Sequence, residues 1–202
     1  KSRSTAGGKS KINPVFVDFT DIDVDIKQYR KKMGPKVEWI PPVEYLESGN
    51  IGAGGMPAFG RLSMWKKYNF DNLKSTILNK FSAINGDSST LIYVVGTLTG
   101  GTGSGLSVDI AYLLQEILPQ CANNIQALFL LPDEASFSKN KSLHENTFSA
   151  LSAIDHYTKI GNDFNIKWPD GTPEKTFTSP PYQMVQFLSQ NFSNGNAPIR
   201  NL

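Results

Sequence analysis

Cysteine is almost absent from this chain, which has a single one, Cys121, among its 202 residues. One thiol cannot form an internal disulfide framework or a cysteine-rich zinc site, so both kinds of scaffold are excluded. No apolar run reaches the roughly 20 residues that a membrane-spanning helix needs. The polar start, Lys1–Ser10, also lacks the apolar stretch of a signal peptide. Together these absences predict a reducing, cytoplasmic setting.

Net charge is also small, at +2, so charge gives no indication of nucleic acid or a membrane surface as a partner. The composition, 39% hydrophobic and 19% charged, is typical of an ordinary globular domain. His144 and His156 have no second His or Cys near them in the sequence, so we do not expect them to hold a metal. The tryptophans lack interleaved basic residues and are expected to pack rather than to stack on bases: Trp39, Trp65 and Trp168.

Apolar runs and helical stripes alternate along the chain. The runs that predict strands are Pro14–Phe19, Ser89–Leu98, Ile125–Leu131 and Tyr182–Leu188. The continuously apolar centre of Ser89–Leu98 predicts a strand covered on both faces. The stripes that predict helices are Asn72–Phe81, Leu106–Leu118 and Leu143–Ile160, the last with Phe148, Leu151 and Ile154 on its apolar side; Arg61–Tyr68 is a further helix start.

Glycine and proline mark the segments between these elements: Gly49–Gly60 predicts a loop, and Gly161–Pro181 a turn-rich insertion. Because strands alternate with helices, the sequence predicts an α/β fold, a Rossmann-like parallel sheet with helices on both faces. In such sheets ligands bind at the carboxyl ends of the strands. The segment Thr99–Gly105 lies at such an end, so we expect the ligand there.

The segment Thr99–Gly105 (TGGTGSG) joins the strongest predicted strand to a predicted helix. It contains four glycines: Gly100, Gly101, Gly103 and Gly105. Glycine leaves no side chain between backbone and ligand. The first amides of the following helix have no internal partner, and the helix dipole is positive there, so the loop can wrap a phosphate. Thr102 and Ser104 add hydroxyl donors. A plain turn would need one glycine rather than four.

The spacing within this loop excludes two common phosphate-binding motifs. A dinucleotide fingerprint spaces its glycines as G-x-G-x-x-G, whereas Gly101, Gly103 and Gly105 are two apart. A Walker loop has a lysine before its Ser or Thr, and no lysine follows here. The one Gly-Lys-Ser, residues 8–10, has Arg3 at the leading position and no strand before it, so we interpret it as part of a polar arm.

The loop resembles the GGGTGSG signature of tubulins and FtsZ, with Thr99 in place of the first glycine. A second loop, Gly52–Gly60 (GAGGMPAFG), resembles the FtsZ sequence GAGGNPEVG and differs from it at Met56, Ala58 and Phe59. The strand end Phe19-Thr20-Asp21 resembles an FtsZ run that ends Asn-Thr-Asp. The resemblance spans about Pro14 to Asn191, and the helix that holds Asn146 resembles the bacterial tubulin-like branch more than FtsZ itself.

This resemblance implies a site for GTP or GDP with Mg²⁺. It implies that the backbone of Gly100–Gly105 holds the α- and β-phosphates, and that Gly52, Ala53, Gly54 and Gly55 approach the γ-phosphate. Thr20 and Asp21 lie near the phosphates in this comparison. Asp18 and Asp21 become the expected magnesium ligands, in keeping with the preference of Mg²⁺ for hard carboxylate oxygens.

Two further positions follow from the resemblance. Glu134, in Pro132–Glu134, follows a strand where the family contacts the ribose, although a surface turn is an equal alternative. Asn191 lies where the family reads guanine, with Gln190 and Asn194 as alternatives. The domain organisation expected is a flexible arm, or the remnant of a missing first strand, over residues 1–13. A nucleotide-binding domain over residues 14–202 follows, truncated before the family's central helix.

The function implied is that of a tubulin/FtsZ-like protein that self-assembles into cytoskeletal filaments and hydrolyses GTP at subunit interfaces. The family's catalytic acidic loop follows the central helix and acts on the neighbouring subunit's nucleotide. We therefore expect this chain to bind nucleotide without hydrolysing it efficiently alone, and assign no catalytic residue. Two alternatives stay open: a non-hydrolysing nucleotide-dependent scaffold subunit, and a Rossmann-like dinucleotide or methyl-donor enzyme, which the spacing of Gly101–Gly105 disfavours.

Overall fold

Three parallel strands form the main sheet of the computed structural model, which describes residues 53–132 and 141–189. The strand order is β1-β2-β5, with bounds β1 Ile92–Thr97, β2 Ile125–Leu131 and β5 Met184–Ser189. The register pairs Val94 of β1 with Ala127 of β2, and Ala127 with Val185 of β5. All three strands therefore end at one edge of the sheet, and the predicted parallel α/β fold is confirmed.

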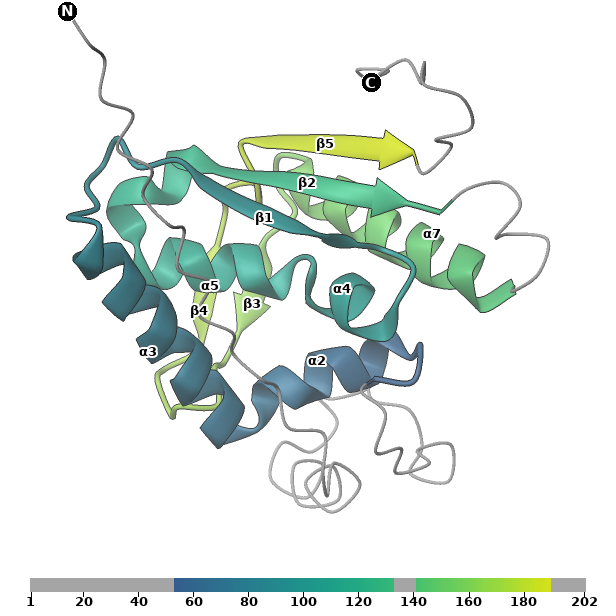
Figure 1. Cartoon of the computed structure of the whole chain (residues 1–202), viewed down its shortest axis with the longest axis horizontal. Coiled ribbons are helices and arrows are strands. Elements are labelled where there is room, and N and C mark those ends of the chain that lie inside the picture. The colour runs from purple at the N-terminus through teal and green to yellow at the C-terminus, as the bar shows by residue number, and fades with distance from the viewer. Residues whose placement is uncertain (1–52, 133–140, 190–202) are drawn as a thin grey trace, which may run out of the picture.

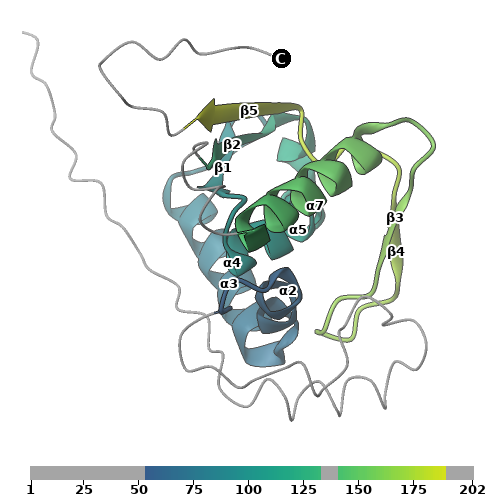
Figure 2. The ribbon, with the colours of Figure 1, turned by 90° about the vertical axis from the view of Figure 1, so that its right-hand side faces the viewer.

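Helices connect these strands and precede the first of them. Their bounds are α2 Pro57–Trp65, α3 Lys67–Ala83, α4 Gly101–Leu106, α5 Asp109–Ile117, the 3₁₀ helix η3 Pro119–Asn124 and α7 Lys141–Thr158. Figures 1 and 2 show the α-helices on one side of the sheet. Within the described ranges no helix covers the other side, so helices on both faces stay a prediction.

The hydrophobic core lies between the sheet and these helices. Ile125, Ala127 and Phe129, alternate residues of β2, are at most 2% exposed, because their side chains point toward the helices. The opposite face of β1 leaves Tyr93 55% and Val95 63% exposed. The prediction that this strand is covered on both faces is therefore wrong for the part of the chain that the structure describes.

The helix predicted over Leu106–Leu118 corresponds to α5, and a separate short helix, α4, forms within the glycine segment that was predicted to be a loop. A division at Ser107 and Val108 separates the two helices. At the division, the hydroxyl of Tyr182 donates to the carbonyl of Ser107, and the hydroxyl of Ser107 donates to the carbonyl of Ser104. These side-chain bonds replace regular backbone bonds at the break. Helix α2 also begins earlier than predicted, inside the expected loop, since Pro57 is suited to the first helical position.

Helix α7 matches the predicted helix Leu143–Ile160 closely in extent and in part of its buried face. Ile154, on the predicted apolar stripe, is buried, and Leu151 is partly buried against the core. Phe148, expected on the same stripe, is 74% exposed, and the buried face passes through Asn146 and Ala150 instead. The predicted apolar stripe is therefore wrong at Phe148 only.

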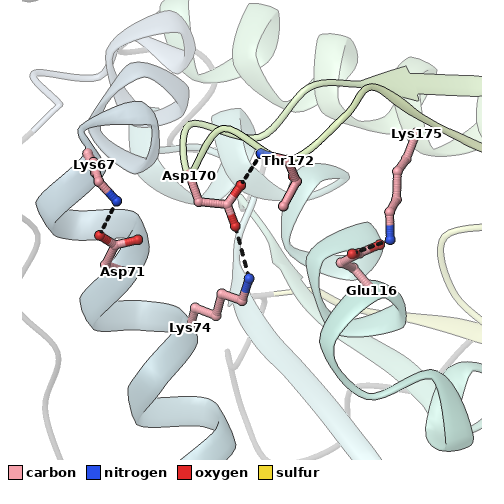
Figure 3. A network of polar contacts seen from close by, with 7 residues as sticks. All are labelled: Lys67, Asp71, Lys74, Glu116, Asp170, Thr172 and Lys175. Atoms are coloured by element: carbon pink, nitrogen blue, oxygen red, sulfur yellow. Dashed lines mark hydrogen bonds and ion pairs between the residues drawn. The ribbon is translucent and has the colours of Figure 1, made fainter.

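The predicted turn-rich insertion contains an antiparallel hairpin, β3 (Phe164–Ile166) and β4 (Lys175–Phe177). Two ion pairs tie it to neighbouring helices: Lys74 of α3 meets Asp170 at 2.9 Å, and Lys175 meets Glu116 of α5 (Figure 3). Between the strands of the hairpin, Trp168 stacks on Phe70 and Trp65, with ring centroids 5.5 and 6.2 Å apart. The packing role predicted for Trp65 and Trp168 is confirmed, and Trp39 lies outside the described residues.

Candidate functional site

The turn before α2 presents bare backbone. Gly54 and Gly55 have φ of +53° and +77°, and the amide of Met56 donates to the carbonyl of Ala53 at 2.8 Å. Positive φ at both central residues is the pattern of a type I′ turn, which glycine adopts without strain. Both glycines are exposed, and apart from their chain neighbours no atom of residues 53–132 and 141–189 lies within 4 Å of the place where a Cβ would be. A ligand can therefore approach this backbone directly.

The segment after β1 presents unpaired amides. Gly100 is the residue before α4, and the first helical bond runs from the Ser104 amide to the Gly100 carbonyl at 3.1 Å. Within residues 53–132 and 141–189, the amides of Gly101, Thr102 and Gly103 have no hydrogen-bond partner, as expected for a first helical turn. Helix α4 has only six residues, so these amides, rather than the long-helix dipole expected from the sequence, would bind an anion.

The two hydroxyl groups expected to act as donors differ in the structure. The Ser104 side chain is buried and donates to the Gly100 carbonyl at 2.5 Å. Its proton is therefore used inside the helix, as is common for serine four residues after a carbonyl. The role of Ser104 as a hydroxyl donor to the ligand stays a prediction, and it requires this bond to be exchanged for one to the ligand. Thr102 is exposed, so its hydroxyl is free to reach a ligand.

Most glycines of the signature are required by packing. An added Cβ would lie 2.6 Å from the Met56 carbonyl oxygen at Gly101, 2.1 Å from that of Pro57 at Gly105, and 1.9 Å from that of Thr97 at Gly103. Real Cβ atoms do not approach backbone so closely. Helix α4 therefore lies directly on the backbone of α2 and on the end of β1. Within the described part of the chain, an added Cβ at Gly100 alone among the four would meet nothing within 4 Å.

From α2, Gly60 completes this backbone contact, since its added Cβ would lie 2.2 Å from the carbonyl oxygen of Gly101. Arg61, the next residue of α2, forms an ion pair with Asp109, the first residue of α5. The guanidinium Nε and Nη2 donate to the two carboxylate oxygens at 2.6 and 2.9 Å. Burial raises the pKa of Asp109, and the charge and hydrogen bonds of Arg61 oppose that rise. This pair joins the segments that follow the two glycine loops.

Asn146, on the buried face of α7, contacts both loops at once. Its side-chain nitrogen donates to the Gly55 carbonyl at 2.6 Å and to the Thr99 carbonyl at 2.9 Å. The sequence interpretation assigned no role to Asn146, to Arg61 or to Asp109. For Asn146 a signal was present, because a polar residue shares a helix face with Ala150 and Ile154.

The structure thus brings together the described part of the predicted site: Ala53, Gly54, Gly55 and Gly100–Gly105. The remaining predicted positions lie outside the described residues: Asp18, Thr20, Asp21, Gly52, Glu134 and Asn191. Across residues 53–132 and 141–189, no three His, Cys, Asp or Glu side chains are grouped to hold a metal ion. In the same ranges, no helix combines the length and apolarity needed to cross a bilayer.

One comparison with known proteins identifies a family for the chain. A family model described as tubulin-like matches residues 9–202, which include both glycine loops and every described element. Searches of curated proteins and of solved structures give no significant match. The family match covers nearly the whole chain, and the chain therefore belongs to the tubulin-like family.

Proposed function

We propose that this chain binds a guanine nucleotide, GTP or GDP, with the phosphates at the two glycine loops. The observation that carries the proposal is that a turn of exposed, bare backbone lies near a helix start with unpaired amides, of which Thr102 is exposed, Gly103 partly buried and Gly101 buried. The free amides of Gly101–Gly103 lie beside α2, whose leading turn exposes Gly54 and Gly55. Successive backbone amides without side chains in front of them form the usual cradle for phosphate oxygens.

The roles within this site follow the family resemblance. Gly100–Gly105 hold the α- and β-phosphates, and residues 52–55 approach the γ-phosphate. Asp18 and Asp21 hold Mg²⁺, which neutralises phosphate charge when bound, with Thr20 beside them. Glu134 contacts the ribose and Asn191 reads the base.

At the level of the whole protein, we propose self-assembly into cytoplasmic filaments, with GTP hydrolysis completed between subunits. Sedimentation of the full-length protein with GTP and with GDP tests this part separately from binding. Pelleting and phosphate release that depend on GTP and rise together with protein concentration support it. Pelleting without phosphate release would indicate a non-hydrolysing scaffold instead.

A thermal-shift panel tests the nucleotide class. GTP and GDP are expected to raise the melting temperature, and a ligand at 100 times its Kd adds about 2.7 kcal/mol of stability. NAD and S-adenosylmethionine are expected to leave it unchanged. The reverse pattern would indicate a Rossmann-like enzyme and contradict the proposal.

A matched pair of variants connects binding to the turn before α2. Gly55→Ala and Gly171→Ala each place a side chain at positive φ, +77° and +88°, with no atom within 4 Å of the new Cβ. Each should cost about 1–2 kcal/mol of backbone strain. Only Gly55→Ala should also weaken GTP binding, because Gly171 lies between the strands of the hairpin. Equal GTP affinity in the two variants would show that Gly55 is not part of the binding site.

A further inference from the structure

The side-chain amide of Asn146 joins two backbone segments that are far apart in the sequence. One nitrogen, Nδ2, donates to the carbonyls of Gly55 and Thr99, at 2.6 and 2.9 Å. An amide nitrogen has two protons, so both are used. The two carbonyl oxygens can then be no farther apart than the sum of these distances. Asn146 is 7% exposed, which shields both bonds from competing water.

The two glycines of this turn have no side chain of their own to place them. Gly54 and Gly55 are both exposed. The turn is held at its ends, since Ala53 is buried against Gly101 and the contact between α2 and α4 continues at Met56 and Gly60. Among the described residues, the bond from Asn146 is the one side-chain hydrogen bond that the turn accepts. Asn146 therefore fixes the carbonyl of Gly55, between these ends, relative to the signature loop.

We propose that Asn146 is a positioning residue that sets the spacing between the two loops, and through it the preference of the site for a triphosphate over a diphosphate. This inference rests on the proposed function. The affinity of a ligand that contacts only one loop does not depend on the spacing between the loops. A longer phosphate chain that reaches both loops gains affinity when their spacing is fixed before it binds.

The substitution Asn146→Asp tests this with almost no change in shape. It replaces the donor nitrogen by the oxygen of a charged carboxylate, which faces two carbonyl oxygens and repels them. Because the added charge would also repel GTP more than GDP, the uncharged Asn146→Leu, which removes both donors, is measured alongside and should show the same loss of selectivity. Thr147→Val is the matched control. Thr147 is the next residue, 5% exposed, and its hydroxyl donates at 2.7 Å to the Leu143 carbonyl within α7, not to a loop. The control loses a buried hydrogen bond of α7 while both loops keep theirs.

Calorimetric titration of the full chain with GTP and with GDP measures the selectivity. Asn146→Asp should weaken GTP binding at least about tenfold, equivalent to 1.4 kcal/mol, while GDP binding changes much less. Thr147→Val should leave the ratio of the two affinities as in the wild type. If Asn146→Asp weakens GTP and GDP equally, Asn146 supports the fold only and the proposed role in selectivity is refuted.

Hydrogen exchange without nucleotide tests the spacing role independently. The amides of Met56 and Ser104 are bonded to the carbonyls of Ala53 and Gly100, so they report on the two loops. Both should exchange faster in Asn146→Asp, with the amides of β2 unchanged. Unchanged exchange at Met56 and Ser104 would overturn the inference whatever the nucleotide data show. If the wild type binds neither nucleotide, the proposed function fails and the selectivity with it, while exchange still decides the positioning role.

Discussion

The substitution Gly105→Ala is expected to destabilise the protein, although alanine is normally the better helix former. In a helix interior this exchange usually stabilises by about 0.5–1 kcal/mol. At Gly105, however, the added Cβ would lie 2.1 Å from the Pro57 carbonyl oxygen and 2.9 Å from the Arg61 amide nitrogen. Both are backbone atoms of α2, so relief requires the two helices to move apart.

The expected size follows from these opposing effects. Overpacking costs about 1–3 kcal/mol, and a contact with backbone at 2.1 Å belongs at the upper end. After subtraction of the gain in helix propensity, a net loss of about 2 kcal/mol remains. Gly100→Ala is the control, since its Cβ meets nothing within 4 Å and its φ of −86° suits alanine. We expect that variant to be unchanged or more stable by up to about 1 kcal/mol.

Urea unfolding followed by tryptophan fluorescence measures both variants. The midpoint should fall clearly for Gly105→Ala and should not fall for Gly100→Ala, with equal slopes. If the two unfolding free energies agree within about 0.5 kcal/mol, the size of an ordinary surface effect, the reasoning is refuted. Gly105 would then be kept for its backbone freedom or for the ligand, rather than for its contact with α2.

Three further perturbations follow from the contacts around the site. Arg61→Leu should cost about 3–5 kcal/mol in urea unfolding by leaving Asp109 buried without its partner, and the double variant with Asp109→Leu should recover most of it; an equal loss in both would contradict this. Partial burial raises the pKa of Asp170, but hydrogen bonds from Lys74 and a backbone amide outweigh it, so the pKa lies below its ordinary value. The ion pair with Lys74 therefore contributes at most about 1 kcal/mol of stability, because it is partly accessible to water. This contribution is complete at pH values above the pKa of Asp170 in the unfolded chain, and it is lost as the pH falls through the lower pKa of the folded protein. Asp170→Asn should accordingly be less stable than the wild type at pH 7 and converge with it in acid, as unfolding at a series of pH values would show. Tyr182→Phe should lower the unfolding free energy by about 1–1.5 kcal/mol, because the carbonyl at the break between α4 and α5 loses its donor; an unchanged thermal midpoint would exclude that role.

The sheet and the position of the site could be predicted from the sequence because their signals are local. Ile125–Leu131 is apolar except for Gln126, as expected for a largely buried parallel strand, and its predicted bounds agree with β2. The glycine cluster directly after Ser89–Leu98 located the segment with free amides. Both inferences need only neighbouring residues, which a single sequence provides.

The remaining features depend on partners far away in the sequence. The packing role of Gly101 and Gly105 depends on α2 and the residue before it, far earlier in the sequence, whose backbone they touch. The Ser104 hydroxyl was expected to reach the ligand, yet a carbonyl of its own helix takes it. Phe148 is exposed and Asn146 buried because α7 turns its polar residue toward the two loops. Helical periodicity identifies a helix, but the contacts made in three dimensions decide which side is buried.

The central claim is that the phosphates of a nucleotide lie against the two glycine loops. Backbone amide chemical shifts of the isotope-labelled protein, recorded while GTP is added, test it directly. The largest changes are expected at Gly54 and Gly55 and at the free amides of Gly101–Gly103. Little change is expected in the hairpin of β3 and β4. Changes confined to other parts of the molecule, or none at saturating GTP, would contradict the account.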